Sequence, residues 1–140
     1  MKKKTMLIEV TSFADDEEIL KMISVGKLCR KKDALLLEWE GEAFDDMRDA
    51  TFLSIKDSQI IVAYSDPGSP VLVLEKGKKC ISFHPSPIPF LPQETAGYSV
   101  SYIKNELTLS GGRLVFEYIT DYHRNKFRRK VDITVSAYGT

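Results

Sequence analysis

The last long stretch of the chain, from Gly111 to Tyr138, constrains the fold most. It contains two runs in which apolar and polar residues alternate, separated by the polar segment 122–126. Side chains alternate between the two faces of a strand, so this period of two predicts two long strands folded back on each other. A shift of the pairing by one residue would bury Lys130 and Asp132, which fixes the register. The expected inward residues are Leu114, Phe116, Tyr118, Val131, Ile133 and Val135.

An isolated pair of strands is only marginally stable in water, so the rest of the chain must supply more sheet. Further strand-like runs, separated by turn signals, occupy residues 6–13, 34–40, 51–56, 59–65, 71–75 and 80–84, with one or two more between 98 and 109. This spacing predicts an all-β fold, an antiparallel up-and-down barrel of about eight to ten strands. We expect a closed barrel because closure removes exposed strand edges, and a single domain over residues 1–140.

Three segments are less regular. Residues 15–25 combine acidic residues suited to the start of a helix with apolar residues at helical spacing, but they also alternate as a strand. We favour the strand, with Gly26 marking a bulge or bend. Residues 42–50 are expected to form one helical turn or a loop after Gly41. The segment 85–93 holds four prolines, which exclude a central strand, and its apolar residues would cover a barrel mouth or present a contact surface.

Charge and cysteine content limit the classes of partner. Twenty basic residues balance twenty acidic ones, which gives no reason to expect nucleic acid or an anionic membrane as partner. The Lys-rich start is followed by a short apolar run that Glu9 interrupts, which favours a strand over a signal peptide, and we expect a cytoplasmic protein. Cys29 and Cys80 are too few for a disulfide framework. We expect two packed thiols, with a Cys29–Cys80 bridge as the alternative.

Two stretches carry a resemblance to a known family. They are LEKGKKCISF, residues 74–83, and LSGGRLVFEYITDYH, residues 109–123. Together with the polar-tipped first hairpin, they make nearly the whole chain similar to the bacterial YwiB-like proteins, also called the domain-of-unknown-function 1934 family. The resemblance implies a calycin- or lipocalin-like barrel, and it implies no activity. The family usually has a Thr-Pro-Tyr-Gly-like turn after its aromatic strand, where this chain has Pro85 to Phe90.

The predicted barrel suggests an interior binding site. Barrels of about eight strands are filled by side chains or hold one small ligand. Aromatic rings would bury a largely apolar ligand, tyrosine hydroxyls would orient it, and residues near the Pro-rich segment would cover it. The predicted ligand-binding residues are Trp39, Tyr64, Phe83, His84, Phe90, Phe116 and Tyr118. The alternative is that these residues only fill the core.

Catalytic and metal-binding patterns are missing from the sequence. No nucleophile and base accompany His84 or His123, and no Gly-rich phosphate loop occurs. The acidic residues 15–18 and 45–49 lack the calcium-loop pattern, and the basic residues 124–130 lack interleaved stacking rings for nucleic acid. We therefore predict no catalytic residue, metal or cofactor. We expect a non-enzymatic module for a small, largely apolar ligand, or alternatively a ligand-free interaction module that acts as a homodimer.

Overall fold

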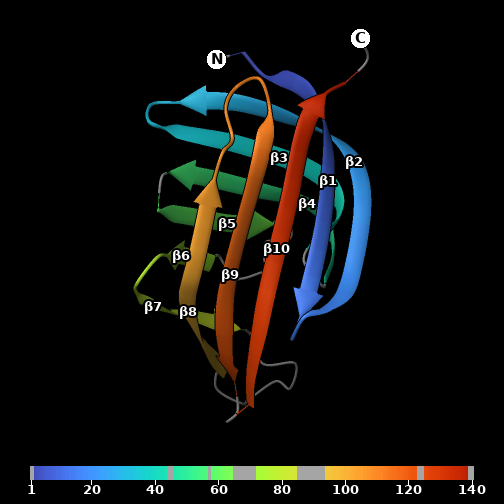
Figure 1. Cartoon of the computed structure of the whole chain (residues 1–140). Helices are drawn as coiled ribbons and strands as arrows, with labels where there is room; N and C mark the ends of the chain where they lie inside the picture. The colour runs from blue at the N-terminus through green and yellow to red at the C-terminus, as the bar shows by residue number, and fades with distance from the viewer. Residues whose placement is uncertain are drawn as a thin grey trace.

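The computed structural model of the chain consists of strands joined by turns (Figure 1). It describes residues 2–43, 46–56, 58–64, 72–84, 94–122 and 125–138, with side chains except at 41–43, 46–50, 64, 80–84, 94–98, 120–122, 125 and 127. No residue in these ranges is helical. The strands are β1 (Lys4–Ala14), β2 (Glu17–Lys31), β3 (Ala34–Ala43), β4 (Asp46–Lys56), β5 (Gln59–Tyr64), β6 (Leu72–Glu75), β7 (Lys79–His84), β8 (Glu94–Asn105), β9 (Gly112–Tyr122) and β10 (Asn125–Ala137).

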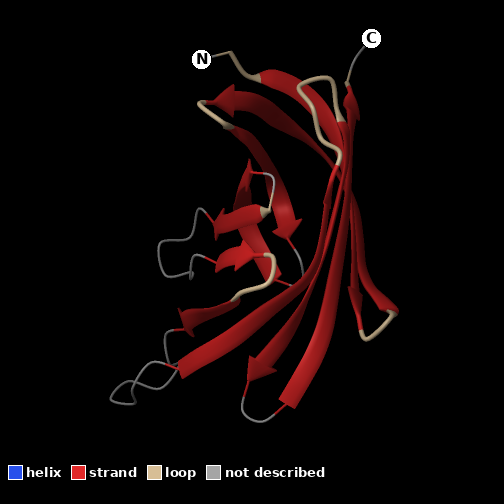
Figure 2. Ribbon diagram, turned by 60° about the vertical axis from the view of Figure 1, so that its left-hand side comes forward, coloured by secondary structure: helices blue, strands red, loops and turns tan. Residues whose placement is uncertain are grey.

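The ten strands form one antiparallel sheet that curves into a nearly closed barrel. Their order is β6-β5-β4-β3-β2-β1-β10-β9-β8-β7, so each neighbour is consecutive in sequence except the pair formed by β1 and β10. The two ends of the sheet, β6 and β7, lie next to each other, and in the turn that joins them the backbone N–H of Gly77 donates to the carbonyl of Val100 on β8 at 3.4 Å. Figure 2 shows the long strands curving along one side, with the shorter strands facing them. The predicted all-β up-and-down barrel is confirmed.

The closing hairpin has the predicted register. Val131 lies opposite Phe116, and Ile133 lies opposite Leu114. All four side chains are buried, with exposed fractions of 0–1%, while Asp132 between them points outward and pairs with Arg113. The guanidinium makes two bonds to this carboxylate, at 2.9 and 2.6 Å. The hydrogen bond and the attraction of Asp132 raise the pKa of Arg113.

Residues 15–25 belong to the first hairpin, and the favoured strand is confirmed. Asp15 and Asp16 have φ values of +48° and +69° and form a two-residue turn between β1 and β2, a conformation that Asp tolerates better than most residues. The turn also contacts β10, because the Asp15 carboxylate accepts the Arg128 N–H at 3.0 Å and Asp16 pairs with the Arg128 guanidinium. Pairing with β1 therefore overrides the local helix signals.

Gly26 permits a close approach and does not mark a bulge, so that part of the expectation is wrong. The ladders of β2 with β1 and with β3 both run through Gly26 without a register shift. A Cβ atom at this position would lie 2.2 Å from the Glu38 carbonyl oxygen and 2.2 Å from Cδ1 of Ile8. At this position β2 pairs with β1 on one side and with β3 on the other. Only glycine leaves room there for the Ile8 side chain.

Two segments differ from the expectation in opposite ways, because one extends strand pairing and the other replaces a predicted strand by a tight turn. Residues 42–50 were expected to be a helical turn or a loop. Instead β3 runs through Gly41 to Ala43, and Glu42 pairs with Met47, after a register shift at Gly41. The stretch from Leu107 to Leu109 is not a strand in the described structure, since Thr108 and Gly111 exchange two backbone hydrogen bonds in a tight turn. Ladder formation satisfies backbone groups that a loop would leave to water.

Candidate functional site

The predicted ligand-binding residues with described side chains lie in the barrel interior. Trp39, Phe116 and Tyr118 have exposed fractions of 2%, 0% and 7% and belong to one hydrophobic core. The Phe116 and Tyr118 rings are stacked, with their centroids 6.2 Å apart. The register aligns Trp39 with Thr51, and Thr51 with Tyr64, across β3, β4 and β5. The side chains of Tyr64, Phe83 and His84, and the whole of Phe90, lie outside the described structure.

The described part of the interior is closely packed. Side chains with an exposed fraction of 0% have no space beside them for even a water molecule, and this holds for Ile8, Val10, Leu28, Ile60, Val62, Leu114, Phe116 and Ile133. These residues come from β1, β2, β5, β9 and β10, so they surround the interior from several sides. The structure thus places Trp39, Phe116 and Tyr118 in a packed core, while a ligand-binding role for the seven predicted residues stays a prediction.

Among the described side chains, two hydroxyl groups inside the barrel have no hydrogen-bond partner. They are Oγ of Ser12, exposed by 3%, and Oγ1 of Thr51, exposed by 0%. A buried hydroxyl without a partner costs roughly 1–3 kcal/mol.

We expect Thr51→Val to raise the free energy of unfolding by about 1 kcal/mol, because valine keeps the shape of the side chain and removes the unpaired hydroxyl. Urea denaturation followed by circular dichroism measures the change. Thr108→Val is the matched control, since the Thr108 hydroxyl donates to the Gly111 carbonyl at 3.1 Å and accepts the Ser110 N–H at 3.2 Å. The control should be destabilised. A loss of stability in Thr51→Val would show that this hydroxyl is bonded in solution.

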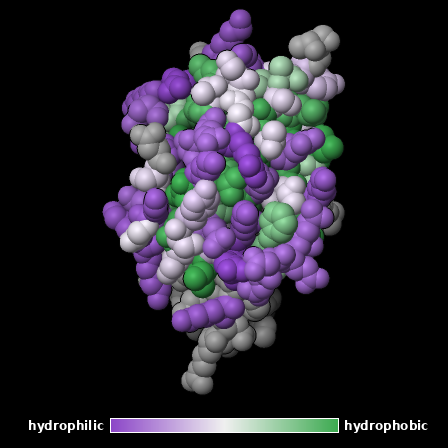
Figure 3. Space-filling view, in the orientation of Figure 1, coloured by the Kyte–Doolittle hydropathy of each residue, from purple (hydrophilic) through white to green (hydrophobic). Residues whose placement is uncertain are grey.

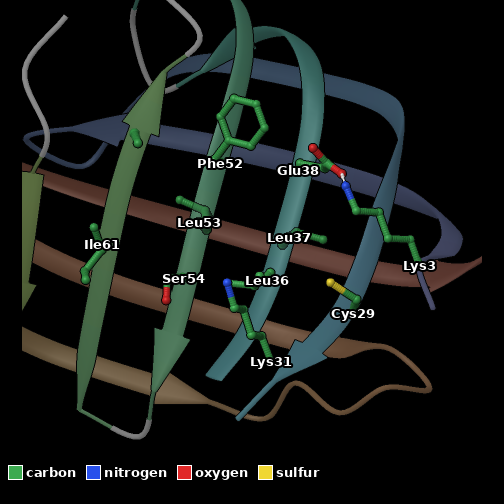
Figure 4. Close-up of a pocket in the computed structure, with 11 residues that line it drawn as sticks. Lys3, Cys29, Lys31, Leu36, Leu37, Glu38, Phe52, Leu53, Ser54 and Ile61 are labelled. Carbon is green, nitrogen blue, oxygen red and sulfur yellow. Dashed lines mark hydrogen bonds and ion pairs between the residues drawn. The ribbon is translucent and has the colours of Figure 1, made fainter. Parts of the chain in front are cut away.

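An apolar groove crosses the outer surface of β2, β3, β4 and β5. The register aligns Cys29, Leu36, Ser54 and Ile61 in one row across these strands. The next row holds Lys27, Glu38, Phe52 and Ala63. Between the rows lies a hollow of about 290 Å³, near the lower limit for small-molecule sites. Its sides are formed by Leu36, Phe52, Ile61 and Ala63 (Figure 4).

The rim of the groove is polar and mainly cationic. The Lys3 ammonium lies 2.7 Å from Oε1 of Glu38, and this hydrogen bond raises the pKa of Lys3. Lys31, at the end of β2, also lines the groove, and Cys29 is a buried residue of its wall, with an exposed fraction of 2%. Because Cys29 is a free thiol, the alternative Cys29–Cys80 bridge is wrong. A second hollow of about 330 Å³ continues past Glu38 and Phe52 toward Val25.

The opposite wall of the barrel is a weaker candidate. Figure 3 shows its outer face, where hydrophilic side chains surround small apolar areas. A hollow of about 400 Å³ lies there between Tyr102, Arg113 and Lys130. Two of its cations are paired, since Arg113 binds Asp132 and Lys104 lies 3.4 Å from Glu106, and the Lys130 ammonium lies over the Phe13 ring, 5.7 Å from its centroid. Such a surface offers a ligand little apolar area.

Sequence reasoning missed the outer groove, although the sequence holds a signal for it. Strands with one buried face alternate, whereas the runs Leu35-Leu36-Leu37, Ile60-Ile61-Val62 and Leu72-Val73-Leu74 are apolar at every position. Unbroken apolar runs are typical of strands that are covered on both faces. Here the inner members, such as Leu37 and Ile60, are buried, while Val73 on the outer face is 39% exposed. The outer members therefore form an apolar surface that faces solvent.

In the described ranges, no group of three His, Cys, Asp or Glu side chains is placed to hold a metal ion. The acidic residues 45–49 lie in a region whose side chains are not described. None of the described residues belongs to a helix of membrane-spanning length and hydrophobicity.

Comparison with known proteins identifies a similar fold. No protein-family model matches the chain. No curated protein matches it either. The crystal structure of the ywiB protein from Bacillus subtilis is similar, with a TM-score of 0.73 and 16% sequence identity over 99% of this chain and 94% of that one. At this identity the similarity shows a shared barrel fold.

Proposed function

We propose that the protein is a non-enzymatic binding module that takes a small, largely apolar ligand in the groove on the outer face of β2–β5. The observation that carries this proposal is the groove itself, where Leu36, Phe52 and Ile61 leave an apolar hollow of about 290 Å³ beneath a polar rim. Small-molecule sites combine such apolar walls with a few polar groups. The closely packed surroundings of Phe116 favour this groove over the barrel interior.

The expected affinity is modest. A ligand that buries about 200 Å² of apolar surface in the groove would gain about 5 kcal/mol from the hydrophobic effect. The loss of translational and rotational freedom opposes binding. Dissociation constants from tens of micromolar upward are therefore the range to examine.

Ile61→Lys is expected to weaken the binding of N-phenyl-1-naphthylamine, a neutral apolar fluorescent probe, by at least about tenfold, because a charged side chain in the middle of the groove opposes an apolar ligand. Val73→Lys is the matched control. Val73 is the next residue in the same row on β6, is 39% exposed, and does not line the groove. Fluorescence titration measures both. Equal probe affinity in wild type and Ile61→Lys would place the binding site elsewhere.

The second candidate function, homodimerisation, uses the same face. Val25, Phe52 and Val73 are 39–44% exposed around the groove, and contiguous apolar surface is typical of protein interfaces. Native mass spectrometry of the same two variants separates the candidates. A dimer that dissociates in both Ile61→Lys and Val73→Lys indicates a broad protein contact. A monomer that loses probe binding only in Ile61→Lys indicates a ligand groove.

We also infer that the chain is a member of the YwiB-like family with a calycin-like barrel. The shared fold over 99% of the chain supports this assignment, together with the sequence stretches 74–83 and 109–123. A cytoplasmic location is part of the proposal, and the free thiol of Cys29 is consistent with a reducing compartment.

A further inference from the structure

One lysine at the groove, Lys31, has no ion-pair partner among the described residues. Lys3 is paired with Glu38, and Lys56, at the neighbouring turn, lies 3.7 Å from Asp33. Lys31 is exposed and lines the groove. Within the described part of the chain it has no hydrogen bond or ion pair.

A hydroxyl group lies on the floor of the same groove. Ser54 stands between Leu36 and Ile61 in the outer row of the sheet and is half-buried. Its hydroxyl makes no hydrogen bond in the described structure. Figure 4 shows the Lys31 side chain extending from β2 toward Leu36, and Lys31, Leu36 and Ser54 all line the groove. The Lys31 ammonium and the Ser54 hydroxyl thus line one end of the groove, and the apolar side chains of Phe52 and Ala63 line the other end together with the Lys3–Glu38 pair.

We propose that the ligand of this groove is an apolar carboxylic acid whose carboxylate is bound by Lys31 and Ser54. This inference rests on the proposed ligand-binding function. The two carboxylate oxygens accept hydrogen bonds from the Lys31 ammonium and the Ser54 hydroxyl, and the hydrocarbon part lies against Phe52 and Ile61. Charge-assisted hydrogen bonds of this kind are about twice as strong as neutral ones.

The charges of the groove select this class of ligand over two others. A cationic ligand would face Lys31 and find Glu38 already bound to Lys3. A phosphate carries between one and two negative charges near neutral pH. A single unpaired lysine beside apolar walls does not neutralise that charge. One carboxylate matches one ammonium, so the pair forms without leaving an unpaired charge in the groove.

Isothermal titration calorimetry with decanoate, decanol and decylammonium tests the inference, because the three probes share one hydrocarbon chain and differ in the head group. We expect decanoate to bind at least about tenfold more tightly than decanol, and decylammonium to bind most weakly. Lys31→Met should lower decanoate affinity to the level of decanol, and Ser54→Ala should lower it several-fold. Lys21→Met is the matched control, since Lys21 is an exposed lysine on the same strand and face, outside the groove, and its variant should bind decanoate as wild type does.

The outcomes separate this inference from the function on which it rests. Equal affinity for decanoate and decanol, with no effect of Lys31→Met, overturns carboxylate recognition and leaves an apolar groove. Binding of none of the three probes overturns the groove function and the carboxylate inference together. An equal loss in Lys31→Met and Lys21→Met overturns the inference as well, because it indicates attraction by net charge. Both lysines are exposed, so we expect both variants to fold, and circular dichroism of the variants checks this.

Discussion

Replacing Gly112 by alanine is expected to lower the free energy of unfolding by about 3–5 kcal/mol. Gly112 begins β9 with a φ of +136°, a conformation that residues with a Cβ atom rarely adopt. An added Cβ would also lie 2.2 Å from the Glu106 carbonyl oxygen. The strain and the clash act at the same position, and the obstructing atom belongs to the backbone, so no side-chain rotation relieves them. Urea denaturation followed by circular dichroism measures the loss.

Gly77→Ala is the matched control for this substitution. Gly77 has a φ of +81°, and no atom lies within 4 Å of a Cβ added there. Its substitution should therefore cost only the left-handed conformation, about 1–2 kcal/mol. Equal losses in the two variants would show that the backbone near Glu106 moves aside and that conformation alone decides the effect.

Phe116→Ala is expected to lower the free energy of unfolding by about 3–5 kcal/mol, the usual cost of removing a buried aromatic ring. Phe116 is among the largest fully buried side chains, and it lies against Tyr118 and opposite Val131. Removing the ring leaves a cavity that a barrel wall of paired strands cannot collapse to fill. Urea denaturation measures the effect. Ile119→Ala is the control on the same strand, because Ile119 faces outward and is 38% exposed, so its loss should stay below about 1 kcal/mol.

The same substitution tests the interior as a ligand site. If Phe116 lined an existing cavity, its removal would only enlarge that cavity and would destabilise the protein little. A loss of about 1 kcal/mol in Phe116→Ala would therefore support the interior residues Trp39, Phe116 and Tyr118 as a ligand-binding wall, and would weaken the case for the outer groove. A loss of several kcal/mol would identify them as packed core.

The strands could be predicted from the sequence wherever one face is buried and the other is solvated. In β10, Val131, Ile133 and Val135 alternate with charged or hydroxyl-bearing residues, so a single register satisfies both faces. The pairing of residues 42–43 with 46–47 could not be predicted, because the local residues favour a turn and only the partner strand decides otherwise. The role of Gly26 depends on Ile8, which lies on a different strand, and the space between them exists only in the folded sheet.

The candidate site was harder to predict for a related reason. Aromatic residues such as Trp39 and Phe116 suggest a binding wall by their chemistry, but the same chemistry fills cores. The outer groove consists of aliphatic residues such as Leu36 and Ile61 whose importance lies in being apolar on the solvent side. That property depends on which face of each strand points outward. Lys31 becomes a candidate ligand contact because Lys3, another lysine at the groove, is already paired with Glu38.

The pairing of β1 with β10 has a consequence for folding during synthesis. Met6 pairs with Ala137, so β1 leaves the ribosome well before β10 and must wait for it before its second edge is covered. Such distant pairing gives a high contact order and slow folding. During that interval β1 presents an open edge with the apolar residues Leu7 and Ile8 to other nascent chains. Expression at low temperature, or with chaperones that bind extended segments, should therefore favour native barrel over aggregate.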